Sequence, residues 1–193
     1  MSDVRREVEV KIPCQENPLD RFPELVREIV AARHFEDNWL LDFDDRRLAR
    51  KDSVLRVRLV GDRGWITFKR AVKDDTPYKV REEIEAETDN PQAVLALLRH
   101  LDLKPVFRYQ KFRTSYRVSL PSGASLSAMY DETPIGNFLE VEGTEAAIDE
   151  FLGHLGIAQH AVITLSYPAL YKARCRESGG SDTEMVFGDT TMA

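Results

Sequence analysis

The sequence predicts an α+β fold: a closed eight-stranded antiparallel β-barrel with inserted and flanking helices. Charged and apolar residues alternate with period 2 in about eight segments, a pattern typical of strands with two different faces. Three or four stretches between them carry apolar residues at helical spacing, and glycine or proline residues separate the segments. Eight strands favour closure into a barrel, because a closed ring leaves no exposed strand edge.

The composition indicates one domain in a reducing compartment. The 193 residues include 42% apolar and 31% charged residues, with a net charge of -6 and two distant cysteines. This acidity argues against general binding to nucleic acid or to an anionic membrane, which needs a basic surface. No apolar run has the length of a membrane span or of a signal peptide, so we expect a cytoplasmic protein. Residues 1–175 are predicted to form one domain, and the polar segment 176–193 a disordered tail.

The first half of the chain predicts five strands and two helices. Alternation marks 4–12 as a strand, and apolar residues at helical spacing predict a helix over 18–34, with Asn17 as its N-cap. A strand over 39–45, an irregular link over 46–52 and a charged loop over 73–77 are also expected. The remaining elements here are a hairpin of strands 53–60 and 65–72 around a glycine turn, a strand over 78–88 and a helix over 90–100.

The second half predicts three more strands and two helices. Strands are expected over 105–120, 125–132 and 137–143, with turns at Pro121–Gly123 and Pro134–Gly136. Thr144 is a good N-cap for a helix that runs to about Gly153, and a last short helix is expected over 166–175.

Sorting each strand by side-chain direction gathers charged residues on one face. Residues i, i+2 and i+4 of a strand share a side. The bland interpretation is a solvated sheet face with cross-strand ion pairs. Carboxylates and cations come in separate pairs here, however, and charges inside a closed barrel must be paired or bound to an ion. Clustered carboxylates suit Mg²⁺, and arginine and lysine pairs suit phosphate, so the face favours a polyphosphate with a divalent cation. The face collects Glu7, Glu9, Lys11, Arg56, Arg58, Trp65, Thr67, Lys69, Arg81, Glu83, Glu85, Lys111, Arg113, Asp131, Glu140 and Glu142.

Several motifs in order resemble the CYTH domains, or triphosphate tunnel metalloenzymes, from about residue 4 to 172. EVEVK (7–11) matches the ExExK signature of that family, which includes class IV adenylate cyclases, thiamine triphosphatases and inorganic triphosphatases. Similar family motifs are LRVRL (55–59), WITFKR (65–70), YKVREEIEAE (78–87), KFR (111–113), YDETPIGNFLEVEG (130–143) and SYPAL (166–170). LLDFDDRRL (40–48) departs from the family's Tyr-Tyr-Asp-Thr-Pro type of strand and turn.

The resemblance implies a triphosphate tunnel and a role for each matching residue. Glu7, Glu9 and Lys11 are the catalytic candidates. The implied ligands of Mg²⁺ or Mn²⁺ are Glu7, Glu9, Glu140 and Glu142, with Glu83, Glu85 and Asp131 as further acidic candidates. The implied triphosphate-binding residues are Lys11, Arg56, Arg58, Lys69, Arg81, Lys111 and Arg113. Which residue acts as the general base is left open.

Three functions follow as alternatives. The first is a metal-dependent triphosphatase that acts on inorganic triphosphate, ATP or thiamine triphosphate. The others are a class IV adenylate cyclase, which makes cyclic AMP and pyrophosphate, and a non-catalytic polyphosphate-binding module. The intact acidic set disfavours the module. A homodimer is an open alternative.

A few residues outside these motifs also merit an expectation. For Trp39 and Trp65, packing is favoured over stacking on a ligand. Ser166 and Tyr167 are expected to serve as a cap and a core aromatic. The four histidines are expected to have no catalytic role, because none has a nucleophile or a metal-ligating partner in the sequence pattern.

Overall fold

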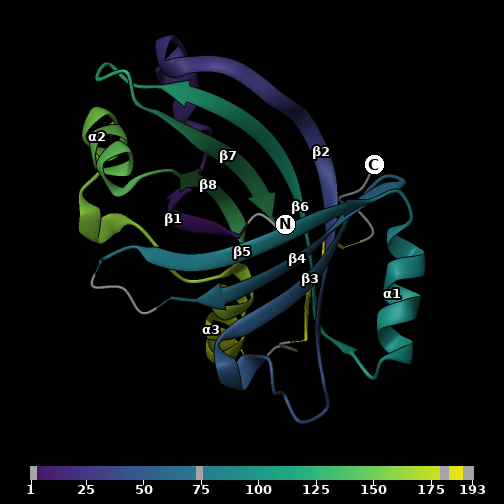
Figure 1. Cartoon of the computed structure of the whole chain (residues 1–193). Coiled ribbons are helices and arrows are strands. Elements are labelled where there is room, and N and C mark those ends of the chain that lie inside the picture. The colour runs from purple at the N-terminus through teal and green to yellow at the C-terminus, as the bar shows by residue number, and fades with distance from the viewer. Residues whose placement is uncertain (1–3, 73–75, 179–182, 189–193) are drawn as a thin grey trace.

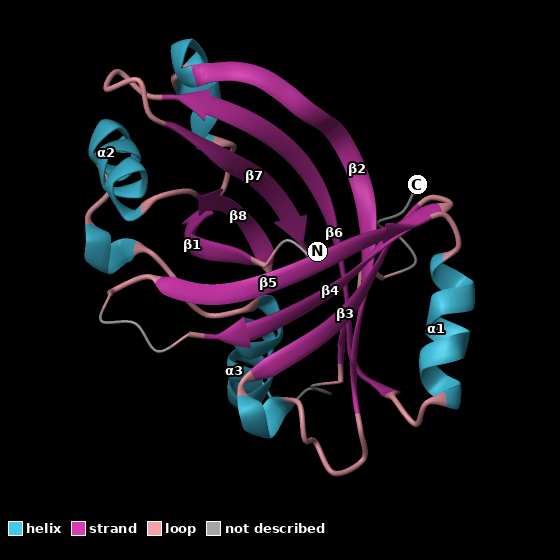
Figure 2. Cartoon of the chain, in the orientation of Figure 1, coloured by secondary structure: helices cyan, strands magenta, loops and turns pink. Residues whose placement is uncertain are grey.

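Eight antiparallel strands close into a ring, which confirms the predicted fold class. The computed structural model describes residues 4–72, 76–178 and 183–188. The strands follow the order β2-β3-β4-β5-β1-β8-β7-β6, and pairing between β2 and β6 completes the circle (Figure 1). A short ninth strand, β9, pairs in parallel with β6. Helices α1 and α2 lie at the outside of the sheet (Figure 2), whereas the start of α3 packs against Phe107, Tyr109 and Phe138 on the other face of the sheet.

The strand and helix limits agree with the alternation and capping signals over most of the chain. Thr144 caps α2 through its side chain, as expected, and Asn90 caps α1 in the same way. The strands are β1 (Arg5–Cys14), β2 (Val26–Asp42), β3 (Ser53–Val60), β4 (Arg63–Ala71), β5 (Lys79–Thr88), β6 (Lys104–Ser119), β7 (Ser125–Thr133), β8 (Gly136–Glu142) and β9 (Glu184–Met185). The α-helices are α1 (Pro91–His100), α2 (Glu145–Leu155) and α3 (Tyr167–Ser178).

The apolar outer faces of the strands are covered by α1 and α2. Val8, Val10 and Ile12 of β1 lie in a core cluster with Ile148 and Phe151 of α2. A second cluster places Leu95 of α1 against strand residues of β2 and β3. Burial of these side chains is the main stabilising contribution, at about 25 cal/mol per Å² of apolar surface. The charged faces are thereby left to line the interior of the ring.

The predicted helix over 18–34 is wrong. Only two short 3₁₀ turns form, Pro18–Arg21 and Pro23–Leu25, and β2 begins at Val26. Pro23 explains the break, because it has no N–H to donate and restricts the residue before it. Beyond it, the β-branched residues pair with β6, where Val26 faces Val118. The strand expected over 39–45 is the end of this same long strand.

The turn after β2 is held by one carboxylate. Asp42 is buried and accepts hydrogen bonds from the backbone N–H groups of Phe43 (2.8 Å), Leu48 (3.0 Å) and Ala49 (3.0 Å). Burial raises the pKa of Asp42, but the three backbone N–H donors and a nearby arginine lower it by more, so this pKa lies below its ordinary value. The turn that departs from the family pattern is therefore a defined structure with its own anchor.

The structure describes part of the segment that was predicted to be a disordered tail. Within 176–193, α3 continues to Ser178 and Glu184–Met185 forms β9. The rest of that segment, and most of the loop expected over 73–77, lie outside the described residues. In the described ranges, no helix has both the length and the apolar character needed to cross a membrane.

Candidate active site

The charged faces of the strands meet inside the ring. Opposite charges are direct register partners at several positions around it, which places the pairs by strand pairing alone. These partners include Lys11 with Glu140, Glu36 with Lys111, Lys69 with Glu83, Arg113 with Asp131, Glu7 with Arg81, and Glu9 with Lys79. All of the predicted site residues except Asp131 line one of two cavities in this lumen.

The two cavities divide the lumen into a basic half and an acidic half. The basic half is lined by six cationic side chains and two carboxylates: Lys11, Arg56, Lys69, Lys79, Arg81 and Lys111, with Glu9 and Glu140. The acidic half is lined by six carboxylates, Glu7, Glu36, Glu83, Glu85, Glu140 and Glu142, together with Arg5, His34, Arg56, Arg58, Lys69 and Arg113. Arg56, Lys69 and Glu140 line both halves and mark their boundary.

In the basic half, lysines link the carboxylates of β1 and β8. Lys11 Nζ lies 3.2 Å from Glu9 Oε1 and 3.1 Å from Glu140 Oε2. Lys79 forms a further ion pair with Glu9. Burial lowers the pKa of Lys79, and the Glu140 charge opposes that shift. A buried ammonium with a lowered pKa is poorly solvated, so an anion in this cavity would stabilise its charged form.

Asp131 is a hub behind the cavity wall. Its carboxylate is fully buried and accepts two hydrogen bonds of 2.6 Å from Arg113 and one of 3.0 Å from Lys111. Tyr167 Oη donates a hydrogen bond of 2.7 Å to the same carboxylate. Burial lowers the pKa of Arg113, but Asp131 and Glu140 outweigh it and hold this pKa well above its ordinary value. The arrangement fixes the direction of two cations that line the lumen.

In the acidic half, Lys69 and Arg58 contact carboxylates from three strands. Lys69 Nζ lies 2.5 Å from Glu7 Oε1 and 2.6 Å from Glu83 Oε2. Arg58 lies 3.4 Å from both Glu36 and Glu85.

Glu36 remains ionised by virtue of its neighbours. Burial alone would raise the pKa of Glu36, but Lys111 and Arg58 hold it well below its ordinary value.

The Nε atoms of Arg56 and Arg58 are buried and have no hydrogen-bond partner among the described residues. Each of the two guanidiniums therefore has one buried donor without an acceptor in the described part of the chain.

Glu142 is the carboxylate least compensated by cations. It faces Glu9 in the β1–β8 register, and burial together with the charges of Glu7, Glu140 and Glu83 raises the pKa of Glu142 to about 7. Like charges directly opposite each other destabilise a strand pair unless a cation lies between them. Carboxylate oxygens are the ligands that hard divalent cations prefer, and here Glu7, Glu9 and Glu140 are each ion-paired with a lysine. In the parts of the chain that the structure describes, no three such side chains are already gathered at the spacing of a metal site.

Several lumen residues were not predicted from the sequence, although two of them follow the same two-residue alternation as the predicted ones. Lys79 lies two residues before Arg81 on the same face, and Tyr109 two before Lys111, so period 2 alone identifies both. Tyr109 Oη accepts a hydrogen bond of 3.3 Å from Arg56. Glu36 and Asn38 are buried lumen residues on β2, and their face is not predictable when the preceding segment is assigned to a helix.

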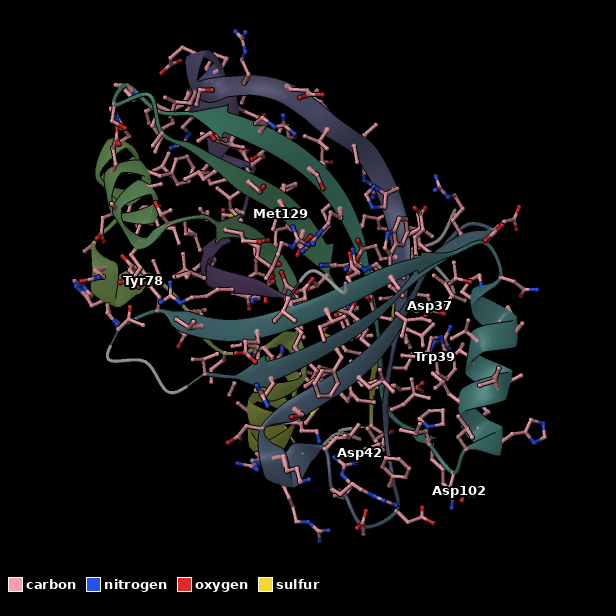
Figure 3. The ribbon with its side chains drawn as sticks, in the orientation of Figure 1. Asp37, Trp39, Asp42, Tyr78, Asp102 and Met129 are labelled. Carbon is pink, nitrogen blue, oxygen red and sulfur yellow. The ribbon has the colours of Figure 1, made fainter. Side chains whose placement is uncertain are left out.

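The two tryptophans lie on opposite faces of the sheet. Trp65 lines the acidic half, with the Arg58 guanidinium 5.8 Å from its ring centroid. Trp39 packs on the outer side near α1, where its Nε1 donates to Asp37 (Figure 3). Met129 lies inside the ring and also lines the acidic half (Figure 3). Packing on the outer face is therefore confirmed for Trp39, and Trp65 is available to a ligand.

Tyr167 is a core aromatic and a cavity residue at once. It is buried in a cluster with Phe107 and Phe138, as predicted, but it also lines the basic half next to Ser166. The ammonium groups of Lys11 and Lys111 lie 5.2 and 5.3 Å from its ring centroid. Aromatic faces attract cations at such distances, so the ring helps to hold both lysines.

Comparisons with known proteins agree with this geometry. The sequence matches the CYTH domain family over residues 5–154. A Methanocaldococcus jannaschii protein named "Putative adenylate cyclase MJ0240" is 26% identical over 172 residues, which cover 83% of this chain and 94% of that protein. The PH1819 protein of Pyrococcus horikoshii has the same fold, with a TM-score of 0.69 and 23% identity over 87% of this chain and 99% of that one.

A plant protein shares the fold as well. HpAC1 from Hippeastrum, whose structure is described as that of a "putative adenylyl cyclase" with a dominant triphosphatase activity, superimposes with a TM-score of 0.62. Its identity is 18%, and the match covers 88% of this chain and 95% of that one. The family match spans most of the sequence and includes the strands that build the lumen, so this chain belongs to the CYTH domain family.

Proposed function

We propose that this protein is a divalent-metal-dependent triphosphatase that hydrolyses a triphosphate held in the basic half of the lumen. The observation that carries this proposal is the charge balance of that cavity, with six cationic side chains against two carboxylates. Lys69 and Lys111 also pair with carboxylates outside this cavity, but the six cations converge on one space, and a triphosphate offers them several negative charges along a short chain. The triphosphatase activity described for the Hippeastrum protein supports the same reaction class.

The chain's own residues would bind the substrate and stabilise charge during phosphoryl transfer. Lys11, Lys79 and Lys111 present ammonium groups to phosphate oxygens, and Arg56 and Arg81 offer forked guanidinium contacts. Phosphoryl transfer depends mainly on positioning and on stabilisation of negative charge, which these groups supply without large rearrangement. The ion pairs that hold them in the absence of substrate keep them pointing into the lumen.

The carboxylates Glu7, Glu9, Glu140 and Glu142 would hold Mg²⁺ or Mn²⁺. A bound divalent cation would neutralise substrate charge and orient the phosphate chain. Among these four carboxylates, the protonation of Glu142 would change most on metal binding, since its pKa of about 7 reflects burial and its acidic neighbours. A cation beside it favours the ionised carboxylate, so metal binding is coupled to release of a proton near neutral pH.

An adenylate cyclase is the second candidate, and one feature of the basic half favours it. Leu40, Val54 and Pro168 line the same cavity as the cations and offer apolar contact to an organic group attached to the phosphates. The name of the Methanocaldococcus relative points the same way.

A substrate panel separates the candidates. The purified protein is incubated with inorganic triphosphate, ATP or thiamine triphosphate, each with Mg²⁺, Mn²⁺ or EDTA, and phosphate, pyrophosphate and cyclic AMP are measured. A triphosphatase releases phosphate in the metal samples only. Cyclic AMP with equimolar pyrophosphate would establish the cyclase instead. Tight binding of triphosphate without turnover would indicate a non-catalytic binding module.

A matched pair of lysine variants tests where the reaction occurs. Lys79→Gln removes a lumen cation, whereas Lys104→Gln removes an exposed lysine that pairs with Asp44 on the surface. We expect Lys79→Gln to lower kcat/KM by about tenfold or more, because charge-assisted phosphate contacts are among the stronger hydrogen bonds. Lys104→Gln should match the unmodified protein. Equal activity of the two variants would place the reaction outside the basic half.

A further inference from the structure

The C-terminal segment Thr183–Gly188 lies beyond the family match and docks beside the basic half. In β9, Glu184 and Met185 pair in parallel with Arg108 and Tyr109 of β6. β7 pairs with β6 only from Phe112 onward, so β9 occupies the part of β6 that β7 does not use. The Phe187 N–H donates a hydrogen bond of 3.1 Å to Gln110 Oε1, which extends the attachment past the strand.

Two apolar side chains anchor the segment. Met185 is 0% exposed and belongs to the same cluster as Tyr109 and Tyr167. The Phe187 ring lies 5.4 Å from that of Phe112, centroid to centroid. A fully buried side chain in an apolar cluster fixes the positions of its neighbours, because cores are close-packed.

Both tyrosines in this cluster form hydrogen bonds with charged side chains in or behind the lumen wall. Tyr109 accepts a hydrogen bond from Arg56, and Tyr167 donates one to Asp131, the hub that holds Lys111 and Arg113. The two rings lie 6.1 Å apart. Met185 is thus one contact away from the groups that set the direction of the lumen cations.

We propose that the segment Thr183–Gly188 is a latch that holds α3 against β6 and keeps Tyr167, a positioning residue, bonded to Asp131. The latch acts through packing of Met185, and its effect reaches the lumen through the Tyr167 hydroxyl. Release of the latch therefore loosens α3 and weakens polyanion binding in the basic half. The second consequence rests on the proposed function, whereas the first does not.

Thiol reactivity tests the latch without any ligand. Cys175 is buried on α3 beside Tyr171, and Cys14 at the end of β1 is an internal control. The full chain is alkylated with iodoacetamide, and each cysteine is followed by peptide mass spectrometry. We expect Met185→Ala to raise the rate at Cys175 by about tenfold or more, since truncation of a buried methionine leaves a cavity and favours local opening.

Two controls make the thiol result decisive. Met185→Leu conserves volume and should restore the slow rate at Cys175 to within about twofold. Leu152→Ala truncates a residue of the separate cluster under α2 and should not accelerate Cys175 selectively. An unchanged rate at Cys175 in Met185→Ala, or equal acceleration at Cys14, would overturn the latch.

A double-mutant cycle tests the link to the lumen. Binding of inorganic triphosphate is measured by calorimetry in EDTA for Tyr167→Phe, Met185→Ala and the double variant. We expect each single variant to weaken binding by about threefold to tenfold, and the double variant by no more than the stronger single one, because coupled residues are non-additive. Multiplicative effects would show that Met185 does not act through Tyr167. If the unmodified chain does not bind triphosphate, the proposed function fails, and the thiol rates still decide the latch.

Discussion

Removal of the negative charge at Asp131 is predicted to destabilise the protein strongly, even without metal. Asp131→Asn keeps the shape of the side chain but leaves Arg113 and Lys111 without their closest anion. Breaking a buried ion pair from one side costs about 3–5 kcal/mol. Glu140 lies 3.0 Å from Arg113 and Glu36 lies 3.5 Å from Lys111, so part of the compensation remains. The lower end of that range, about 3 kcal/mol, is therefore expected.

The assay is thermal unfolding in EDTA, with Asp37→Asn as the matched control. For a chain of this size, about 3 kcal/mol corresponds to a loss of roughly 6–12 °C in Tm. Asp37 also binds an arginine, Arg108, through two hydrogen bonds of 2.9 Å, but that pair is on the outer face and partly exposed. Its loss should cost at most about 1 kcal/mol.

Added triphosphate sharpens the result. It supplies negative charge to the cations that Asp131→Asn leaves unpaired, so the ligand should raise the Tm of this variant more than that of the unmodified protein. The competing hypothesis makes Asp131 a metal ligand, as the resemblance allowed. Under that hypothesis, the variant is normal in EDTA and differs only when metal is added. A Tm loss in EDTA no larger than that of Asp37→Asn would refute the hub.

Two further predictions concern the acidic half and the turn after β2. The pKa of Glu142 is raised to about 7, so the folded protein binds a proton more tightly than the unfolded chain, and stability in EDTA should fall as pH rises from about 4.5 to 7. Glu142→Gln should abolish this loss and be roughly 1–3 kcal/mol more stable than the unmodified protein at pH 8, with little difference near pH 4, when urea unfolding is compared. An equal dependence of the unfolding free energy on pH in both proteins would show that the pKa of Glu142 is not raised. Asp42→Ala should cost about 1–3 kcal/mol, because three backbone donors lose their acceptor, and Asp42→Asn should recover part of that loss in the same assay. No loss in Asp42→Ala would contradict the anchoring role.

Wherever a strand was recognised, the two-residue alternation was enough to identify which of its side chains face the lumen. The ExExK strand, the paired arginines of β3 and the carboxylates of β8 all lie on the lumen side, because alternation fixes side-chain direction once a strand is known. The same rule failed for Glu36 only because its strand was misassigned. The run 18–34 has helical spacing, but pairing of Val26–Asp42 with β6 outweighs that local preference.

The contacts that link distant parts of the chain could not be predicted in this way. Tyr167 reaches Asp131 from a helix that follows the last lumen strand, and alternation within strands carries no information about it. The polar composition of the tail also hid β9, because two anchoring side chains, Met185 and Phe187, are too few to change the average character of the segment.

The division of the lumen into two halves follows from the position of each charged residue along its strand rather than from the overall composition. Along β1, Glu7 lines the acidic half and Lys11 the basic half, and along β5 Glu83 and Arg81 divide in the same way. The halves meet at Arg56, Lys69 and Glu140, which line both. A polyanion held by the basic half and a cation held by carboxylates would come together at this boundary. On the proposed function, substitutions there should therefore lower kcat more than substitutions deep in either half, which should act mainly on binding.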